Sequence, residues 1–376
     1  MDLSTSTSSE SGLGPFRRLR RLAGILAAGV LVIAPFGTGP VRAQDWQSRL
    51  RSFDLYRTSE LDIEEFKRLN RPAVLEIVEA FAAGDFDSVE RVGAGVRAAI
   101  EAGGDFAYIE ISLTTSFDGD TNDIDVTIEL VDTADAESRL SFAAAPTGSV
   151  EDPDGVLAAW AEYQSTALDL VNARQMSPEI LLADCPALHC VFGFDHDKLG
   201  PFLARFDRAA RENRATLLRV LRENSDAEER AAAVFVLAHG KDADWLVEAL
   251  HPSLDDPAAE VRNNVLRVMS MIAQTDDRIE IPFAPLARRI DDPSGGVRNK
   301  TSLLIAAIAH RPEYRDDILA ILPSVMRLLR MAKPNNHDPA YEILKTISGR
   351  NYGDRDYARW EAWVAAKAVV PAGARE

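Results

Sequence analysis

The sequence predicts a mainly α-helical protein, in which an α/α superhelix (a solenoid) follows a small acidic α+β domain with a β-hairpin or meander. Two patterns predict this: a motif recurs at an offset of 36 residues, and the apolar period changes from helical to alternating between residues 72 and 130. The distribution of charge also divides the chain into two parts. Residues 44–198 hold 31 acidic and 11 basic residues, whereas residues 199–376 hold 26 of each. Such a shift predicts a domain boundary near Gly200-Pro201.

Length and composition narrow the class of protein. The chain has 376 residues, of which 46% are hydrophobic, so about two globular domains are expected. The formal net charge of −17 argues against a nucleic-acid partner, because phosphates are bound by clustered lysine and arginine.

Residues 1–43 are expected to be a secretory signal peptide. A basic segment precedes a 15-residue apolar run at 22–36 and the small-residue site Val41-Arg42-Ala43, and its arginines are Arg17, Arg18, Arg20 and Arg21. The run is shorter than the about 20 residues that span a bilayer. Cleavage after Ala43 would remove five arginines and two acids, leaving a periplasmic or secreted chain of charge −20 with no stable membrane anchor.

The acidic α+β domain is predicted over residues 44–176. Its expected elements, in order, are short helical stretches around Trp46–Tyr56 and Ile63–Arg68, amphipathic helices at Pro72–Ala83 and Ser88–Ala102, alternating strands at Ile109–Phe117 and Ile124–Leu130, a third strand around Leu140 and Phe142, and a helix from Val156 to Arg174 that would cover the sheet.

The turn between the two alternating strands resembles a calcium loop in its spacing. Asp118, Asp120, Asn122 and Glu129 occupy positions 1, 3, 5 and 12 of the EF-hand pattern, but Asp123 stands where that pattern requires glycine. An acidic hairpin of this kind more often lies in solvent without a bound ion. A calcium-dependent structural or adhesion protein is therefore kept only as an alternative. Between Arg97 and Arg139 there are 11 acids and no basic residue, and a bound cation or a basic partner would relieve their repulsion.

A linker with the chain's two cysteines is expected at 177–198. Cys185 and Cys190 lie five residues apart, which predicts a small disulfide loop in an oxidising compartment. The alternative is a zinc site completed by His189 and His196, but this spacing is not that of a known zinc finger.

The C-terminal half carries an internal repeat. The run Asp255–Asn264 recurs as Asp291–Lys300, and the apolar residues that follow superpose at the same offset of 36. Degenerate copies open at Asp226 and at His337. Each copy predicts one helix, and a second helix of each unit is expected at 243–250, 282–290, 314–329 and 357–367.

This half resembles HEAT-repeat proteins over roughly residues 199–370, in its Asp-Pro starts and in the pairs Val261-Arg262 and Val297-Arg298. The resemblance implies stacked helix pairs in a right-handed superhelix, at 199–372, and it implies that Arg262 and Arg298 act mainly in structure. Family members are usually scaffolds or binding surfaces. The tail, with Trp360 and Trp363, is expected to cap the last repeat.

One edge of the predicted superhelix is the candidate partner-binding surface. If the repeat units stack, three of the units place their polar residues at equivalent positions. These residues are Arg262, Asn263 and Asn264; Arg298, Asn299 and Lys300; and Asn335, Asn336, His337 and Asp338. Asn336 and Asp338 are alternatively helix caps.

The leading hypothesis is an exported, non-catalytic scaffold that binds another protein or peptide of the cell envelope. No nucleophile elbow, phosphate loop, dinucleotide fingerprint or zinc-protease helix occurs, so no cofactor is expected. The competing hypothesis is a periplasmic hydrolase or metal-dependent enzyme with its chemistry near His337 and Asp338 or in the segment from Cys185 to Asp197.

Overall fold

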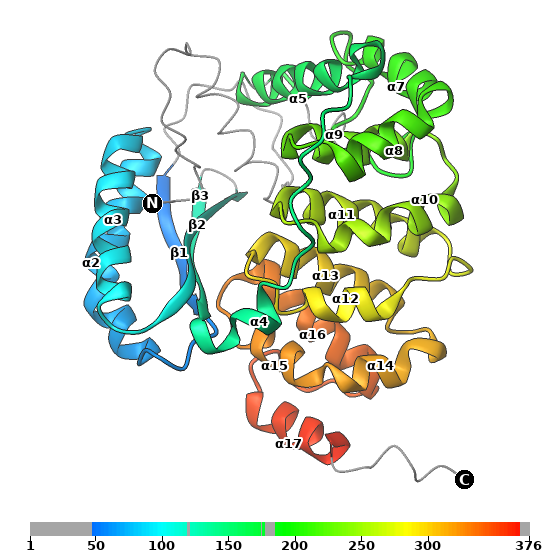
Figure 1. Ribbon diagram of the computed structural model, residues 1–376. Helices are drawn as coiled ribbons and strands as arrows, with labels where there is room; N and C mark the ends of the chain where they lie inside the picture. The colour runs from blue at the N-terminus through cyan, green and yellow to red at the C-terminus, as the bar shows by residue number, and fades with distance from the viewer. Residues whose placement is uncertain (1–46, 119–120, 174, 177–184, 369–376) are drawn as a thin grey trace, which may run out of the picture. The chain divides into compact units, whose positions relative to one another are not determined.

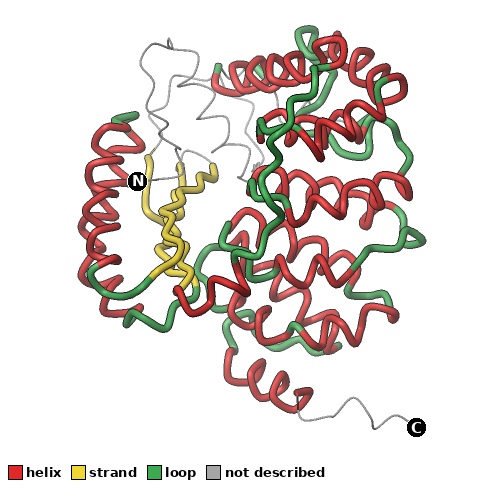
Figure 2. Tube along the Cα trace, viewed as in Figure 1, coloured by secondary structure: helices red, strands yellow, loops and turns green. Residues whose placement is uncertain are grey.

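The computed structural model describes residues 47–118, 121–173, 175–176 and 185–368, so the predicted signal segment at 1–43 lies outside the described residues (Figure 1). The described chain is mainly α-helical, with a small mixed sheet in its N-terminal part (Figure 2). Contacts divide the chain into two compact units. The sheet unit comprises Met1–Ser141, Asp292–Gly295 and Arg327–Asp338, and the helical unit comprises Phe142–Asp291, Gly296–Met326 and Pro339–Glu376.

The sheet unit contains three strands in the order β1-β3-β2, with β1 parallel and β2 antiparallel to β3. The predicted hairpin is confirmed as β2 and β3, which extend further than the alternating apolar residues alone indicated. The elements are β1 (Gln47–Tyr56), α2 (Ile63–Ala82), α3 (Phe86–Glu101), β2 (Phe106–Asp118), β3 (Thr121–Asp132) and the short α4 (Ala136–Arg139).

The third strand is β1, so the expectation of a helical stretch at residues 46–56 was wrong. Phe53 and Leu55 join the apolar core, while Asp54 lies between them on the opposite face of the sheet, as the period of two in a strand requires. Only a few residues carry this alternation, which is why the sequence did not reveal it. The segment expected to supply the third strand is not one, because Leu140 directly follows α4 and Phe142 begins the helical unit.

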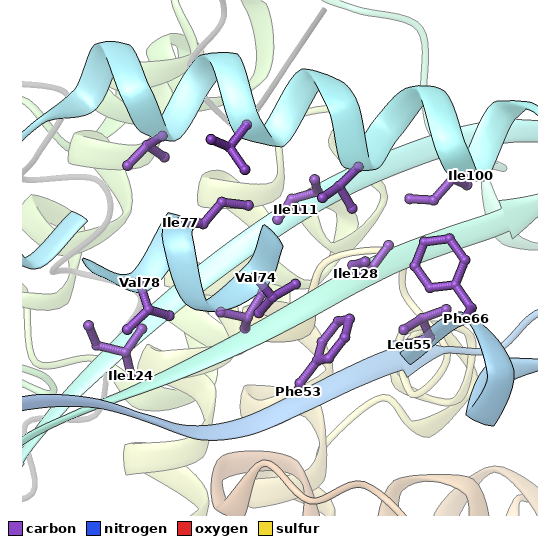
Figure 3. Close-up of a cluster of buried hydrophobic side chains, with 14 of the residues drawn as sticks. Phe53, Leu55, Phe66, Val74, Ile77, Val78, Ile100, Ile111, Ile124 and Ile128 are labelled. Atoms are coloured by element: carbon purple, nitrogen blue, oxygen red, sulfur yellow. The ribbon is translucent and has the colours of Figure 1, made fainter. Parts of the chain in front are cut away.

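Helices α2 and α3 pack against one face of the sheet (Figure 3). The core between them is aliphatic and fully enclosed, with Val74 and Ile77 of α2, Ile100 of α3 and Ile128 of β3 all 0% exposed. Asp62 caps α2 by accepting a hydrogen bond from the backbone N–H of Glu65. The helix predicted to cover the sheet is α5 (Val156–Asn172), and it packs instead within the helical unit, against α7 and α9.

The other face of the sheet holds the segment 327–338 through a carboxylate. Asp54 is 7% exposed, and its two oxygens accept hydrogen bonds from the backbone N–H groups of Ala332 at 3.1 Å and Lys333 at 2.8 Å. The Lys333 ammonium donates to the Thr114 hydroxyl at 2.7 Å. Two strands of the sheet therefore fix a segment that lies almost 280 residues later in the chain than Asp54.

We expect Asp54→Ala to lower the free energy of unfolding by about 2–3 kcal/mol, because the part-buried N–H of Ala332 and the buried N–H of Lys333 lose a charged acceptor. Urea unfolding of the full chain measures this. Asp87→Ala is the control, since Asp87 is exposed in the first turn of α3 and should change stability by less than about 0.5 kcal/mol. Equal losses in the two variants would contradict the role of Asp54.

The helical unit is a series of helices that follow one another in a stack (Figure 1). After α5 they are α7 (Gly200–Glu212), α8 (Arg214–Glu223), α9 (Ala227–Ala238), α10 (Ala243–Leu250), α11 (Ala259–Thr275), α12 (Phe283–Arg289), α13 (Gly295–Ile308), α14 (Arg315–Ala320), α15 (Leu322–Leu329), α16 (Pro334–Ser348) and α17 (Tyr357–Ala368). The first residue of α13, the end of α15 and the first turn of α16 are assigned to the sheet unit.

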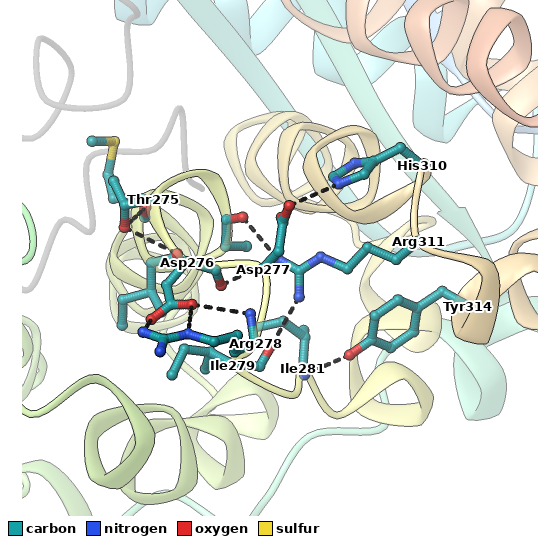
Figure 4. Close-up of polar contacts among 12 residues, drawn as sticks. Thr275, Asp276, Asp277, Arg278, Ile279, Ile281, His310, Arg311 and Tyr314 are labelled. Carbon is teal, nitrogen blue, oxygen red and sulfur yellow. Dashed lines mark hydrogen bonds and ion pairs between the residues drawn. The ribbon is translucent and has the colours of Figure 1, made fainter.

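Helices α9, α11, α13 and α16 coincide with the four predicted copies of the motif, and the stack is compatible with a helical solenoid. Hydrogen bonds join residues one repeat apart: the Tyr314 hydroxyl accepts from the Ile281 N–H, 33 positions away. Arg311, which is 4% exposed, donates to the carbonyl oxygens of Ala273 and Ile279 and so fixes the turn between α11 and α12 (Figure 4). At the end of the chain, Trp360 is 0% exposed and donates to the Gly353 carbonyl oxygen.

Candidate binding site

The repeated arginines of the helical unit are buried within the repeats. The Arg230 guanidinium, 2% exposed, donates to both carboxylate oxygens of Asp256 at 2.8 and 2.9 Å. Arg262, 1% exposed, donates to the carbonyl oxygens of Asp256 and Pro257 and lies 4.1 Å above the Phe142 ring. Arg298 is likewise 0% exposed. Neither Arg262 nor Arg298 therefore offers its guanidinium to a partner at the surface.

The polar run from Asn335 to Asp338 belongs to the sheet unit, whereas residues 262–264 and 298–300 belong to the helical unit. Asn336 is fully buried and donates to the Gly295 carbonyl oxygen at 3.3 Å. The Nδ1 atom of His337 lies 2.6 Å from the Leu329 carbonyl oxygen, and the ring is 7% exposed. Asn335 is partly exposed and Asp338 exposed. His337 is thus packed against backbone, which gives no support to chemistry centred on it.

The candidate site lies where Asn264 of α11 and Lys300 of α13 occupy equivalent positions of neighbouring repeats. Asn264 donates to the Ala231 carbonyl oxygen of α9 at 3.1 Å, which places the repeat helices α9 and α11 side by side here. Lys300 is 6% exposed, and within the described chain its ammonium makes no hydrogen bond or ion pair. Arg267 follows Asn264 by three positions on the same face of α11. Asn263 and Asn299, also predicted site residues, are 8% and 3% exposed.

The disulfide loop supplies the third basic group. Within this loop the Leu188 N–H donates to the Ala238 carbonyl oxygen at the end of α9, and the His189 ring lies 5.4 Å from the Phe235 ring. The Nε2 atom of His189 is buried and makes no hydrogen bond with any described residue. The charges of Arg267 and Lys300 both act on this imidazole. We call His189, Arg267 and Lys300 the basic cluster.

Burial and mutual repulsion disfavour positive charge throughout the basic cluster. Burial, followed by the charge of Arg267, lowers the pKa of Lys300 to about 7. Burial, followed by the charges of Arg267 and Lys300, lowers the pKa of His189 to about 3. Burial alone lowers the pKa of Arg267 to about 10. His189 is therefore neutral at physiological pH, and Lys300 titrates near it.

Sequence reasoning placed Lys300 and Asn264 in the candidate surface but missed Arg267 and the position of His189. One signal pointed to Arg267: its equivalent in the next repeat is Leu303, so a charged side chain replaces an apolar one at a half-buried position. No comparable signal existed for His189, because a loop between helices has no periodicity that reports which helix it covers.

The predicted disulfide between Cys185 and Cys190 is confirmed. Both sulfur atoms are bonded to each other, so neither is a thiolate that could bind zinc together with His189 and His196.

The residues with calcium-loop spacing do not surround one point. Asn122 and Glu129 lie on the same continuous strand, β3, and seven residues of strand separate them by about 23 Å. Asp120 and the side chain of Asp118 lie outside the described residues. In the part of the chain that is described, no group of three or more His, Cys, Asp or Glu side chains is arranged to hold a metal ion.

The acidic strand β3 finds basic partners within its own sheet. Arg49 of β1 donates to Asp123 at 2.6 Å, and Arg51 donates through two nitrogens to Asp125, which is 0% exposed. Parallel pairing of β1 with β3 brings these residues together across 74 positions. Part of the repulsion expected between Arg97 and Arg139 is therefore relieved inside the fold.

Comparison of the chain with models of known protein families, with curated proteins and with solved structures finds no match in any of the three. Within the described residues, every helix is too short or too polar to cross a membrane.

Proposed function

We propose that this chain is an exported scaffold protein whose HEAT-type solenoid binds another protein or a peptide of the cell envelope. The observation that carries the proposal is the row of polar side chains across successive repeat helices, formed by Asn264 and Arg267 of α11 and Lys300 of α13. A repeated fold presents equivalent positions side by side, which suits an extended binding surface. The disulfide supports an oxidising compartment, as expected for a secreted or periplasmic protein.

Two features of the row favour binding over a purely structural role. The core of a solenoid is packed with apolar side chains. Burial of the Lys300 ammonium removes its charge from water at a cost in free energy, and an apolar residue at position 300 would not carry that cost. Residues that lower stability in this way are typical of functional sites. Met271 and Leu303 continue the row on the same helix faces and are partly exposed, so a partner has side chains to contact beyond the basic cluster.

Site-specific photo-cross-linking tests this proposal with the full chain. A photoreactive amino acid placed at Leu303 or Met271 should cross-link one recurring protein in a cell-envelope extract of the source cells. The matched controls are Glu248 on α10 and Arg288 on α12, which are exposed on the other helices of the repeats. Cross-links of equal yield from the control positions, or none from the row, would contradict the proposed surface.

A further inference from the structure

The segment between α4 and α5 lies along the helical unit as an extended peptide. We call residues 142–150 the strap; they belong to the helical unit, contain no helix, and run past the starts of α11 and α9 (Figure 1). Residues 143–145 and 147–149 are exposed. The strap is therefore held by contacts near its two ends rather than by burial along its length.

An aromatic ring is the first anchor of the strap. Two guanidinium groups lie over the Phe142 ring, that of Arg262 at 4.1 Å from its centre and that of Arg289 at 4.9 Å. Both arginines are buried, at 1% and 2% exposure, and a guanidinium that is removed from water attracts the face of an aromatic ring more strongly. The next residue, Ala143, donates its N–H to the Asp255 carbonyl oxygen at 2.7 Å. The helical unit thus provides a slot for one aromatic side chain.

The backbone of the strap is bound at the second anchor. The N–H of Gly148 donates to the Glu223 carbonyl oxygen at 3.0 Å, and its carbonyl oxygen accepts from the Ser225 N–H at 2.8 Å, which forms a parallel β-bridge. The Asn224 side chain, in a residue that is 4% exposed, donates to the Val150 carbonyl oxygen at 3.3 Å. Main-chain hydrogen bonds of this kind bind extended peptides in many complexes.

The second anchor also selects side chains. A Cβ atom on Gly148 would lie 2.7 Å from the Glu223 carbonyl oxygen, so the close approach of the two backbones requires glycine. Val150, two positions later, is 7% exposed and fills an apolar position. The contacts therefore recognise a pattern: an aromatic residue, a glycine six positions after it, and an aliphatic residue two positions after the glycine.

The two anchors lie at the turns that open successive repeat helices. Asn224 precedes α9 and Asp255 precedes α11, so the strap spans two repeats, as an extended ligand of a solenoid does. Between the anchors, residues 144–147 make no hydrogen bond or ring contact with the described residues. A segment with so few contacts can open locally while the repeats keep their own packing.

We infer that the turns before α9 and α11 form a peptide-binding edge, which the strap occupies and thereby blocks. Its external ligand is an extended peptide with the pattern of the strap, aromatic, glycine and aliphatic at the same spacing, and this peptide binds when the strap is released. The inference goes beyond the proposed function, because it concerns a different edge of the helical unit and requires no ligand at the row of Asn264, Arg267 and Lys300.

Fluorescence anisotropy of a labelled synthetic peptide with the sequence of residues 141–151 tests the edge. The full chain with Phe142→Ala and Gly148→Ala should bind this peptide at least about tenfold more tightly than the wild type, because the tethered strap of the wild type competes at an effective concentration on the order of millimolar. Thr147→Ala is the control, since Thr147 is exposed between the anchors, and it should bind as weakly as the wild type.

Peptide variants test the pattern without changing the protein. Replacement of the phenylalanine or the glycine of the peptide by alanine should weaken its binding to the double variant at least about tenfold. The single variants Phe142→Ala and Gly148→Ala each release one anchor and should bind to an intermediate extent, which keeps the test decisive if the double variant does not fold. Circular dichroism confirms that each variant retains its helices.

Three outcomes would overturn the inference. Folded variants that do not bind the peptide would show that the turns are no binding site. Equal binding of the original peptide and of its alanine versions would remove the recognition pattern. A wild type that binds as tightly as the double variant would show that the strap does not block the edge.

Discussion

Replacement of Asp256 by asparagine should cost about 3–5 kcal/mol of the free energy of unfolding, because it leaves the Arg230 guanidinium buried without its counter-charge. Arg230 and Asp256 are 2% and 6% exposed and are joined by two hydrogen bonds. One Asp256 oxygen also accepts from the Ala258 N–H at the start of α11, so the same change weakens that helix end. Urea unfolding followed by circular dichroism measures the loss.

Asp276→Asn is the control for this prediction, since Asp276 pairs with Arg278, whose side chain is 89% exposed. Such a solvent-exposed pair contributes little to stability, because water and salt screen its charges. The double variant Arg230→Met with Asp256→Leu should recover part of the loss, because it leaves no unpaired buried charge. If Asp256→Asn costs no more than Asp276→Asn, the buried pair does not hold the repeats together as described.

Lys300→Met should stabilise the chain, and the gain should depend on pH. The pKa of Lys300 is about 7 in the folded chain and about 10.5 when unfolded. Below pH 7 the lysine is protonated in both states, so the full penalty of its buried charge is present. Between pH 7 and about 10.5 the unfolded state binds more protons, so the stability of the wild type rises with pH.

The gain from Lys300→Met is therefore largest below pH 7, on the order of 2–4 kcal/mol, and fades towards pH 10. Arg267 and His189 face the same lysine. Arg267, with a folded pKa of about 10, loses its charge only at the upper end of this range, and His189 remains neutral, with a folded pKa of about 3. Unfolding at a series of pH values, with Lys198→Met as the control, measures the effect. A gain that does not vary with pH, or a loss, would contradict the buried charge of Lys300.

Asp256→Asn removes a polar group that stabilises the repeats, whereas Lys300→Met removes one that destabilises them. Asp256 and Arg230 satisfy each other, and removal of Asp256 alone is expected to destabilise the helical unit. Lys300 lowers stability and has no described partner, which is the behaviour expected of a residue retained for binding.

The helical unit was predictable from the sequence because its structure depends on short-range order. The copies at Asp255 and Asp291 lie 36 residues apart, and the apolar spacing after each defines α11 and α13 almost to the residue. The pairing of Cys185 with Cys190 was equally local. Contacts within a helix or a short loop involve neighbours in the sequence, so a periodic pattern reports them directly.

The sheet and the candidate site depended on contacts between distant residues. Nothing near Arg49 and Arg51 indicates that they pair with Asp123 and Asp125, because that contact exists only once β1 lies parallel to β3. A parallel pair leaves no turn signature between its strands, unlike the hairpin of β2 and β3.

The sequence by itself determined the repeat, the disulfide and the presence of Lys300 at a repeated polar position. Only the tertiary structure decided that Arg262 and Arg298 are buried, and that the charges of Arg267 and Lys300 act on His189. The physical reason is that periodicity assigns a residue to a face of its own helix. Packing between elements that lie far apart in the sequence decides which residues cover that face. It also decides whether a charge on that face has a partner.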